Sequence, residues 1–458
     1  MQLNRRRFLT TAAAAGGTAC FGAPSILAAD KKNDKLRIAQ IGCGGRGSAH
    51  HGMWRRHQFV AAVDANRKAV DMFSKSALPG LGRYTDYREM YEKHMDEIDA
   101  VIVATPDHSH YPAAMLALMA GKAVFCEKPL AWSVTECLEL AKIVKEKKLP
   151  SQMGNQGNAG RGWRDVYAIV HQDIIGKVKE VHTWTNRPIW PQGLERPDWT
   201  DPVPDTLDWE SWIGPGQMVP YTANWKEKKS GFSGTSVYQP KAWRGWFDFG
   251  CGALGDMACH TMNAMFQTMK PDYDCTVEAV RIVEPSSVQF PKQEIIKWSF
   301  AKSGDCPGFD AYWYDGNLKP EKPDALGDHG LPGQGVMFVG AKGALISFGD
   351  YNQGNTVYID GKKVENPKFE QMIDPSDGGM HGEFLMAAAG QRPWDSPMSN
   401  FMYAGKMTAI INLGIVAARL GAGRKLTFSA KTMKFDDPEA NKLLARKPRE
   451  GWEKPYQV

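Results

Sequence analysis

The sequence has few cysteines and no paired spacing among them. Eight of its 458 residues are cysteine, and none stands in a C-x-x-C pair, so neither a disulfide framework nor a zinc site is indicated. The chain also lacks a run of eighteen or more strongly apolar residues that would indicate a membrane span in the mature chain. The formal net charge of +5 is too small to indicate nucleic-acid binding.

The first 29 residues have the composition of a targeting segment. Three arginines, Arg5 to Arg7, precede a weakly apolar stretch of alanine and glycine that ends in small residues. This pattern resembles a twin-arginine signal, which predicts export to the periplasm or beyond, with cleavage near Ala28 or Ala29. A basic disordered tail is the alternative, and Cys20 is a weaker lipoprotein candidate. Removing residues 1–29 lowers the formal charge from +5 to 5 − 3 = +2.

The remainder divides into two predicted domains with different patterns. Over 35–155, short apolar runs alternate with helical segments, which predicts a parallel α/β sheet of the Rossmann type. Over 156–458, a tryptophan- and proline-rich stretch is followed by strand-like segments, which predicts an α+β domain with an open, mainly antiparallel sheet. These segments lie near 277–283, 293–300, 336–348 and 356–364. From His381 onward, a helical tail is expected to pack back across the sheet or the domain junction.

A glycine motif follows the first predicted strand. Gly42, Gly44 and Gly47 form G-x-G-x-x-G between a strand and a helix, and Asp64 ends the next strand. The glycines allow a tight turn, close approach of a pyrophosphate and close helix packing. An acid at the position of Asp64 binds both ribose hydroxyls and repels a 2′-phosphate. The motif therefore predicts NAD, with NADP less favoured.

Three further motifs carry side chains suited to chemistry. "EKP" places Lys128 at the carboxyl end of a strand, where open α/β sheets bind ligands. "TPDHSH" places His108 and His110 after another strand; without further ligands they indicate the lining of a cofactor cleft rather than a metal site. Asp256 and His260 lie one helical turn apart behind three glycines, so a neutral histidine could accept a hydroxyl proton beside an acid.

Together these motifs, in this order and spacing, resemble the glucose-fructose oxidoreductase, inositol dehydrogenase and MocA (Gfo/Idh/MocA) family, from about Leu36 to the C-terminal helices. The stretches "GNQGN", "TNRPIWPQG" and "WRGWFDFGCGALGDMACH" are similar to an exported branch of that family. The resemblance implies alcohol oxidation, with His260 as general base, Lys128 stabilising the alkoxide and Asp256 aligning a second hydroxyl. It also implies a homodimer or homotetramer.

The residues expected to bind the cofactor lie in the loops at the strand ends. They are Gly42, Gly44, Gly45, Arg46, Gly47, Asp64, Thr105, Pro106, His108, His110, Glu127, Lys128 and Asn155. Substrate contacts are expected from Arg187, with Asn155 as a second candidate. Trp184, Trp190, Trp243 and Trp246 could stack on sugar rings, although half or more of these tryptophans could equally fill the core.

Three functions agree with these residues. The leading hypothesis is an oxidoreductase acting on a hydroxyl of a sugar or sugar derivative, with NAD held tightly because an exported enzyme has no free NAD pool. The second is a glycosidase that oxidises C3 transiently, eliminates the glycosidic bond and returns the hydride, for which His182 and Tyr238 are candidate extra acid/base groups. The third is a non-catalytic protein that binds nucleotide or sugar.

Overall fold

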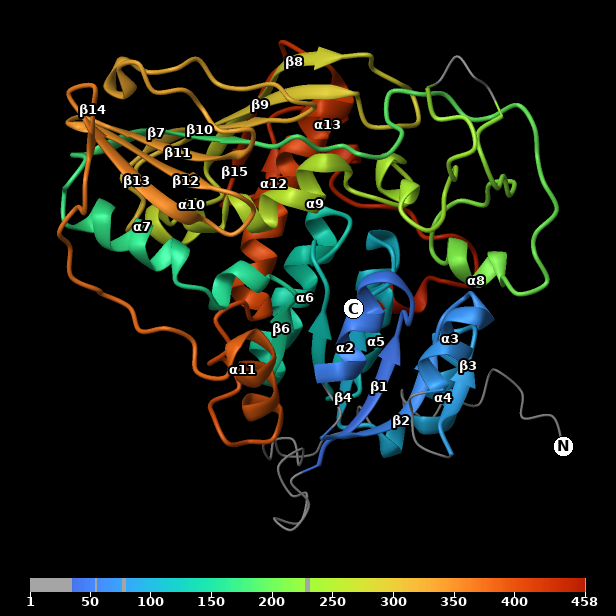
Figure 1. The fold of residues 1–458 in the computed structure, drawn as a ribbon. Helices are drawn as coiled ribbons and strands as arrows, with labels where there is room; N and C mark the ends of the chain where they lie inside the picture. The colour runs from blue at the N-terminus through green and yellow to red at the C-terminus, as the bar shows by residue number, and fades with distance from the viewer. Residues whose placement is uncertain (1–34, 54–55, 76–79, 227–230, 458) are drawn as a thin grey trace, which may run out of the picture.

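The computed structural model of the chain describes residues 35–53, 56–75, 80–226 and 231–457 (Figure 1). The expected export signal, residues 1–29, lies outside this part. Two sheets dominate the fold, and Figure 1 shows them on opposite sides of the long helix α12 (Phe401–Leu420).

Within the described residues, the first sheet contains six parallel strands in the order β3-β2-β1-β4-β5-β6. The strands are β1 (Arg37–Ile41), β2 (Gln58–Val63), β3 (Gly82–Tyr84), β4 (Ala100–Val103), β5 (Ala123–Cys126) and β6 (Ser151–Met153). This is the strand order of a Rossmann fold, in which dinucleotides bind at the carboxyl ends of the strands. The central strands are almost wholly apolar because helices cover both of their faces.

Helices connect the parallel strands. They are α2 (Ser48–Met53), α3 (Arg67–Ser74), α4 (Tyr87–His94), α5 (His110–Met119) and α6 (Val134–Lys147). Local signals in the sequence set where several begin: Asn66 and Asp86 cap α3 and α4, and Ser133 forms a capping box with Glu136 at the start of α6. The carboxyl end of each strand thus passes through a short loop directly into a helix.

The second sheet is mixed and mainly antiparallel, as expected. In the described part of the chain its ten strands run in the order β14-β13-β12-β11-β7-β10-β9-β8-β15-β16. They are β7 (Val178–Trp184), β8 (Cys275–Val283), β9 (Gln293–Phe300), β10 (Phe309–Tyr314), β11 (Gly335–Gly340), β12 (Gly343–Phe348), β13 (Gln353–Ile359), β14 (Lys362–Val364), β15 (Lys425–Ser429) and β16 (Lys434–Phe435). Among their pairings, β7 with β10 is parallel.

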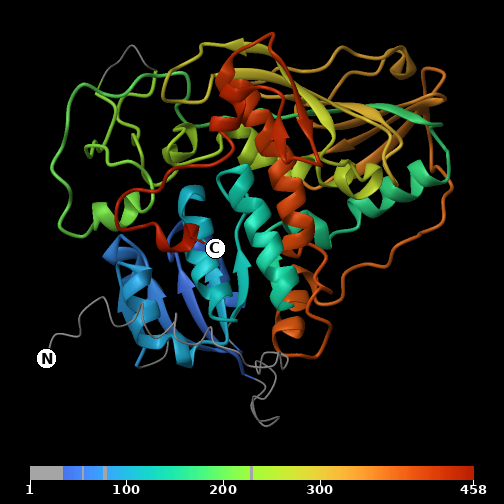
Figure 2. The same cartoon turned by 180° about the vertical axis from the view of Figure 1, so that it is seen from behind.

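The second half contains seven α-helices in the described part of the chain, and the longest of them lies between the two sheets. They are α7 (Gly162–His171), α8 (Trp209–Ile213), α9 (Gly252–Thr261), α10 (Asn263–Met269), α11 (Gly379–Ala388), α12 and α13 (Pro438–Lys442). The long helix α12 packs against α6 on one side and β8 and β9 on the other, so the C-terminal helices do return to the junction (Figure 2). Gly414 of α12 lies against Trp298 of β9, where an added Cβ would approach the indole to 2.4 Å.

Helix α12 is also the one described helix with the length and composition of a membrane span. Its most apolar window is 83% buried inside the protein. Packing between α6 and the second sheet therefore accounts for its apolar composition.

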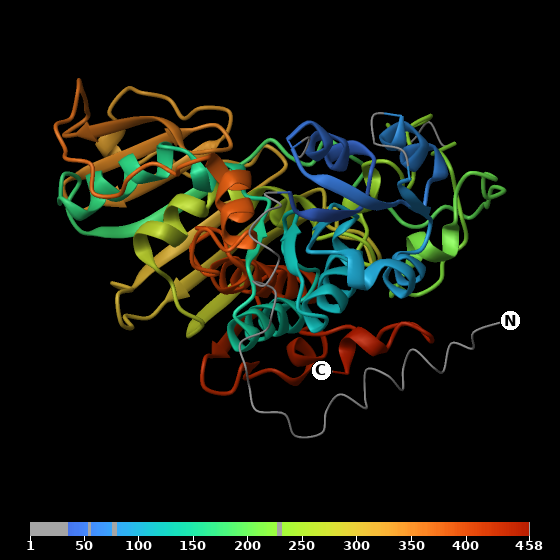
Figure 3. The ribbon, with the colours of Figure 1, turned by 90° about the horizontal axis from the view of Figure 1, so that it is seen from below.

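An insertion between β7 and α9 carries a separate aromatic core. Its buried rings include Trp209, Trp212, Trp225, Tyr238, Trp243, Trp246 and Phe249. Ala65, in the loop after β2, packs against this cluster, so the insertion touches the parallel sheet as well as the second half. Figure 3, seen from below, shows this green segment beside the blue end of the chain, with the red C-terminal tail crossing nearby.

Candidate active site

The glycine motif forms a tight turn at the end of β1. Gly42 has a φ of +88°, and a Cβ on it would lie 2.3 Å from the Ala104 carbonyl oxygen. A Cβ on Gly47 would lie 2.1 Å from the Gly42 carbonyl oxygen. Gly45, also with positive φ, has no atom within 4 Å of its Cβ position. Gly42 and Gly47 of the motif therefore permit close packing of the main chain. Gly45, which lies between them, leaves open space beside the turn.

Asp64 holds the glycine turn from the end of β2. Its Oδ2 accepts hydrogen bonds from the main-chain N–H groups of Cys43 at 2.9 Å and Gly44 at 3.2 Å. Its Oδ1 accepts one from Asn66 at 2.9 Å. Burial raises the pKa of Asp64, although these three bonds oppose the shift. The carboxylate therefore organises the loop as well as standing where a ribose-binding acid is expected.

Lys128, Asp256 and Arg244 form a compact ionic cluster. Lys128 Nζ donates to Asp256 Oδ1 at 2.7 Å and to its main-chain oxygen at 2.8 Å. Arg244 Nε donates to the same Oδ1 at 2.9 Å. Burial alone would raise the pKa of Asp256, but the two cations outweigh it and hold the pKa well below its usual range. The parallel sheet and α9 thus meet at one ionised carboxylate.

His260 lies one turn along α9 from this cluster. Its Nδ1 lies 3.3 Å from Asn155 Oδ1, and the Asn155 amide nitrogen donates to Cys259 O and Asn263 Oδ1. These two bonds fix the Asn155 oxygen toward the ring, so Nδ1 carries the proton and Nε2 keeps a lone pair. Burial, reinforced by the charge of Lys128, lowers the pKa of His260 to about 3. The imidazole is therefore a neutral base at physiological pH.

Asp107 brings a second buried carboxyl group to the cluster. It is 3% exposed, and its Oδ2 accepts a hydrogen bond from the Cys251 N–H at the start of α9, at 3.0 Å. Burial raises the pKa of Asp107 to about 7, although Arg244 and Lys128 oppose the shift. This side chain ties the loop after β4 to the helix that carries Asp256 and His260.

Replacing Asp107 with asparagine should change how stability depends on pH. The folded pKa of about 7 lies above the unfolded value of about 4, so Asp107 stabilises the fold fully below pH 4 and loses that contribution as pH rises to 7. Asp107→Asn keeps an oxygen for Cys251 and does not titrate. Thermal unfolding from pH 5 to 8 should therefore show the wild type losing stability relative to the variant. Parallel curves would contradict the assignment.

Several residues predicted to bind the cofactor have side chains that hold the loops together. The ring of His108 has no exposed surface, and its nitrogens lie 3.2 Å from Phe249 O and 3.0 Å from Trp212 O. His110 similarly lies between Thr105 O and Pro129 O, within 2.9 Å of each. Because both ring nitrogens of each histidine face main-chain oxygens, these side chains position the loops around Lys128.

Glu127 and Asn155 have the same kind of role. Glu127 Oε1 accepts from Arg46 Nε at 3.0 Å and lies 3.0 Å from His50 Nε2. Burial alone would raise the pKa of Glu127, but His50 and Arg46 outweigh it and lower the pKa to about 2. Asn155 is fully buried. Its amide oxygen faces His260 and its amide nitrogen donates to Cys259 O and Asn263 Oδ1, so the side chain positions the base.

The residues at the strand ends fit a dinucleotide. Gly45 leaves an open position at the turn, and Thr105 Oγ1 is buried without a hydrogen-bond partner among the described residues. Arg46 is 40% exposed beside the turn, where a guanidinium can meet a phosphate. Pro106 begins the short helix η5 (Asp107–Ser109) next to Thr105. An open glycine cradle, an unpaired hydroxyl and a nearby cation at one sheet edge are what NAD requires.

The predicted sugar-stacking tryptophans are largely enclosed. Trp184 and Trp246 have no exposed surface, which leaves no ring face for a sugar and corrects that prediction. Trp190 and Trp243 are 6% and 7% exposed and have the Arg244 guanidinium over their rings. They support the ionic cluster rather than a sugar. Arg187 donates to Asn186 from the loop after β7, and no contact links it to His260 or Lys128 in the described part of the chain.

The two extra acid/base candidates also lie elsewhere. His182 is stacked on Tyr312 and bonded to Tyr314, on the face of the second sheet opposite α12. Tyr238 is 2% exposed inside the aromatic core of the insertion. Neither contacts His260, so the structure does not place them as partners of the base. Among residues 35–53, 56–75, 80–226 and 231–457, no group of three or more metal-ligating side chains is found.

Two members of the cluster were missed by the sequence reasoning. Arg244 lies in η8 (Ala242–Gly245), twelve residues before Asp256, and Asp107 lies inside the "TPDHSH" motif that was read for its histidines. Arg244 lies between two tryptophans shortly before the glycines that precede Asp256, and this pattern could have indicated a cation near the carboxylate. Contact between Asp107 and the start of α9 depends on tertiary packing, which no local pattern reports.

The first half of the fold defines an α/β protein with a Rossmann-type parallel sheet. Residues 36–155 match the family model for the oxidoreductase family with an NAD-binding Rossmann fold, named for Gfo, Idh and MocA. The match covers the parallel sheet and its loops and does not extend to the second sheet.

Curated relatives match part of the chain. A glycosyl hydrolase family 109 protein of Shewanella pealeana is 30% identical in an alignment of 204 residues, which covers 39% of this chain and 45% of the relative. The 2,7-anhydro-N-acetylneuraminate hydratase of Escherichia coli is 33% identical over 102 residues, 22% of this chain and 27% of the relative. The chain therefore spans less than half the length of these relatives.

Solved structures share the fold across both halves. An inositol dehydrogenase homologue of Azotobacter vinelandii, complexed with NADH and myo-inositol, aligns with a TM-score of 0.58 at 15% identity, over 86% of this chain and 98% of the other. The WlbA dehydrogenase of Bordetella pertussis, in complex with NADH and UDP-GlcNAcA, aligns with a TM-score of 0.56 at 16% identity, over 86% and 99%. At these identities the likeness establishes the fold.

Proposed function

We propose that this protein is an NAD-dependent oxidoreductase that acts on a hydroxyl of a sugar or sugar derivative and keeps its NAD bound. The observation that carries the proposal is the neutral His260 beside the Lys128–Asp256 pair at the carboxyl edge of the parallel sheet. The complexes of related folds with NADH and myo-inositol or UDP-GlcNAcA support it. Export through the twin-arginine route belongs to the same proposal and rests on residues 1–29.

Each residue of the cluster has a distinct task in this reaction. His260 Nε2 accepts the proton of the substrate hydroxyl, while Asn155 holds the ring through Nδ1. Lys128 uses two N–H groups on Asp256 and has a third for the developing alkoxide. Asp256, kept ionised by Lys128 and Arg244, accepts a hydrogen bond from a neighbouring hydroxyl. Bound NAD supplies the hydride acceptor.

The cofactor would be held by the strand-end loops. The glycine turn and Arg46 face the pyrophosphate, Asp64 the adenosine ribose, and Thr105 offers its unpaired hydroxyl. An ionised acid at Asp64 disfavours a 2′-phosphate, so the proposal specifies NAD rather than NADP.

A redox-assisted glycosidase is the second candidate. The family 109 glycosyl hydrolase relative favours it, since the match covers 39% of this chain at 30% identity. Elimination next to an oxidised carbon needs a further acid or base. Asp107, buried beside Lys128 and Arg244 with a pKa of about 7, is better placed for that task than His182 or Tyr238.

Release and turnover assays separate these functions. Denaturing the purified protein and identifying the released nucleotide by mass spectrometry tests for bound NAD. Absorbance near 340 nm of the intact protein is then followed with monosaccharides and aryl glycosides. A lasting rise on free sugars supports the oxidoreductase, and aglycone release without a lasting rise supports the glycosidase. Absence of nucleotide, with none bound on addition, would contradict both and leave a non-catalytic protein.

A further inference from the structure

A segment of the insertion lies directly against the loop that carries Asp64. Residues 205–214, called the cover here, contain α8 and the turns on either side of it. Arg67 N–H donates to Thr206 O and Asp208 N–H donates to Ala65 O, each at 2.8 Å, and Asn66 pairs with Leu207 as an antiparallel bridge. The cover thus adds main-chain hydrogen bonds to the loop that immediately follows Asp64.

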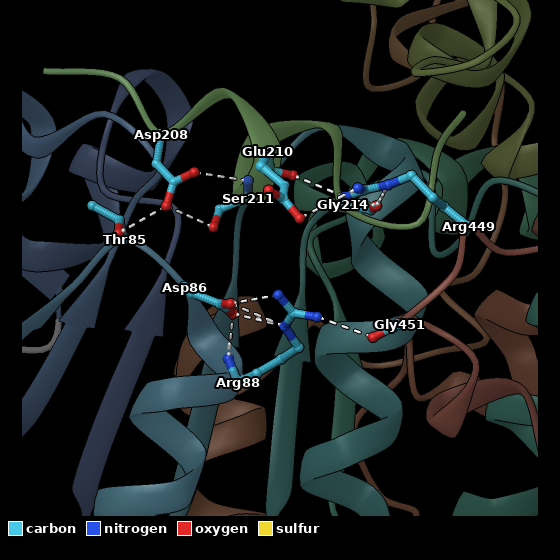
Figure 4. Close-up of polar contacts among 9 residues, drawn as sticks. All are labelled: Thr85, Asp86, Arg88, Asp208, Glu210, Ser211, Gly214, Arg449 and Gly451. Atoms are coloured by element: carbon cyan, nitrogen blue, oxygen red, sulfur yellow. Dashed lines mark hydrogen bonds and ion pairs between the residues drawn. The ribbon is translucent and has the colours of Figure 1, made fainter. Parts of the chain in front are cut away.

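The cover also reaches the next strand end. Thr85, in the loop after β3, donates from Oγ1 to Asp208 Oδ2 at 3.1 Å, while Asp208 caps α8 through the Ser211 N–H and hydroxyl (Figure 4). His108, after β4, lies 3.0 Å from Trp212 O. The loops after β2 and β3 lie at the carboxyl edge of the half of the sheet that binds adenosine in this fold, and the loop after β4 begins the other half. The cover therefore contacts all three loops at that edge.

The C-terminal tail fixes the cover from outside. Arg449 donates from Nε and Nη2 to Gly214 O at 3.2 and 3.1 Å, and from Nη2 to Glu210 O at 3.3 Å. Arg88 of α4 donates to Gly451 O at 3.1 Å (Figure 4). Its guanidinium lies 3.8 Å from the centre of the Trp452 ring. The cover is thus held between the parallel sheet and the last residues of the chain.

Packing of the residue after Asp64 is a second sign that the cover is fixed in place. Ala65 packs on the aromatic core that contains Leu207 and Trp209. Apolar packing therefore adds to the main-chain hydrogen bonds that hold the cover on the loop after β2, while Asp64 itself stays partly exposed.

We infer that residues 205–214 are a fixed part of the dinucleotide site that covers its adenosine end, and that Asp208 and Arg449 keep NAD bound through successive turnovers. This inference rests on the proposed function, because it concerns the cofactor proposed there. Release of NAD requires the cover to separate from Ala65, Arg67 and Thr85. No hydrogen bond in the described part of the chain joins the cover to Lys128, Asp256 or His260, so the cofactor is oxidised and reduced with the cover in place.

The test measures how fast NAD leaves the full mature protein. The protein is loaded with isotopically labelled NAD, freed of excess by gel filtration, and chased with unlabelled NAD, and the label retained is followed by mass spectrometry. Asp208→Ala and Arg449→Ala each remove several hydrogen bonds that hold the cover, and each should speed release about tenfold or more.

Matched controls remove equivalent contacts elsewhere. Asp437 caps the five-residue helix α13 as Asp208 caps the five-residue α8, and Arg424 pairs with Asp437 beside the second sheet. Asp437→Ala and Arg424→Ala should leave the release rate unchanged. Folded Asp208→Ala and Arg449→Ala proteins that release NAD at the wild-type rate would overturn the inference.

A cross-link tests the cover by comparing one variant in two redox states, so that loss of the Asn66 cap of α3 is common to both. Asn66 and Leu207 are a bridged antiparallel pair, whose spacing suits a disulfide, and the cysteines in the described part of the chain are buried. In the Asn66→Cys/Leu207→Cys protein, oxidation should slow NAD release and reduction should restore it. Equal rates in both states would contradict the cover. Wild-type protein that binds no NAD would instead refute the proposed function.

Discussion

Replacing His260 with alanine should lower kcat by about 10²–10⁴-fold while bound NAD is retained. The reason is that Nε2 is the ring nitrogen that keeps a lone pair, because Nδ1 donates its proton to Asn155 Oδ1. The measurement is turnover of the sugar identified in the 340 nm assay, together with the NAD content of the purified variant. If the variant turns over the sugar at the wild-type rate, His260 is not the general base. If neither protein turns over sugar and both bind it equally well, the protein is a binding protein.

An Asn155→Ala variant is the companion to this substitution. It leaves the imidazole in place but removes the acceptor that fixes the tautomer, so kcat should fall less than in His260→Ala. Its pH profile should also change, because Nδ1 and Nε2 would then exchange the proton freely. A pH profile identical to the wild type would show that Asn155 only fills space.

Lys128→Met should lower kcat by about 10²–10³-fold, and Arg244→Met should act mainly on KM. Both cations bond to the same Asp256 Oδ1, so each variant leaves the carboxylate with one cation. Lys128 also donates to the Asp256 main-chain oxygen and has a third N–H for an alkoxide, whereas Arg244 lies over Trp243. The two variants therefore separate charge pairing from stabilisation of the reacting oxygen.

Thermal unfolding provides the control for this pair. Since each variant removes one of two cations from a buried carboxylate, the two should lose similar stability. If kcat falls equally in both, loss of Asp256 orientation explains the effect and the alkoxide role of Lys128 is wrong.

The sequence predicted the framework of the fold because its periodicity is local. Apolar runs such as those of β4 and β5, separated by helical segments, were sufficient to predict the parallel sheet. The strand-like segment 336–348 is two antiparallel strands, β11 and β12, joined at residues 341 and 342. Gly340 and Gly343 flank this two-residue turn, so the sequence does contain a signal for the break between the strands.

The site was predicted in part for a related reason. Lys128, Asp256 and His260 were found because each belongs to a compact motif, and the structure brings Lys128 and Asp256 into contact. Arg244 and Asp107 join them only through tertiary packing. The burial of Trp246 and Trp184 could not be predicted, because tryptophan occurs both on sugar-binding surfaces and in cores and only the tertiary fold decides between them.

The C-terminal tail also constrains the order in which the protein can be made. Arg446 forms an ion pair with Glu136 at the start of α6 at 3.0 Å, and Thr135 N–H donates to Leu444 O. Ribosomal synthesis delivers Arg446 446 − 136 = 310 positions after Glu136, so the parallel-sheet half cannot complete this part of its outer surface until then. The strands of the second sheet are therefore synthesised before the first half is complete.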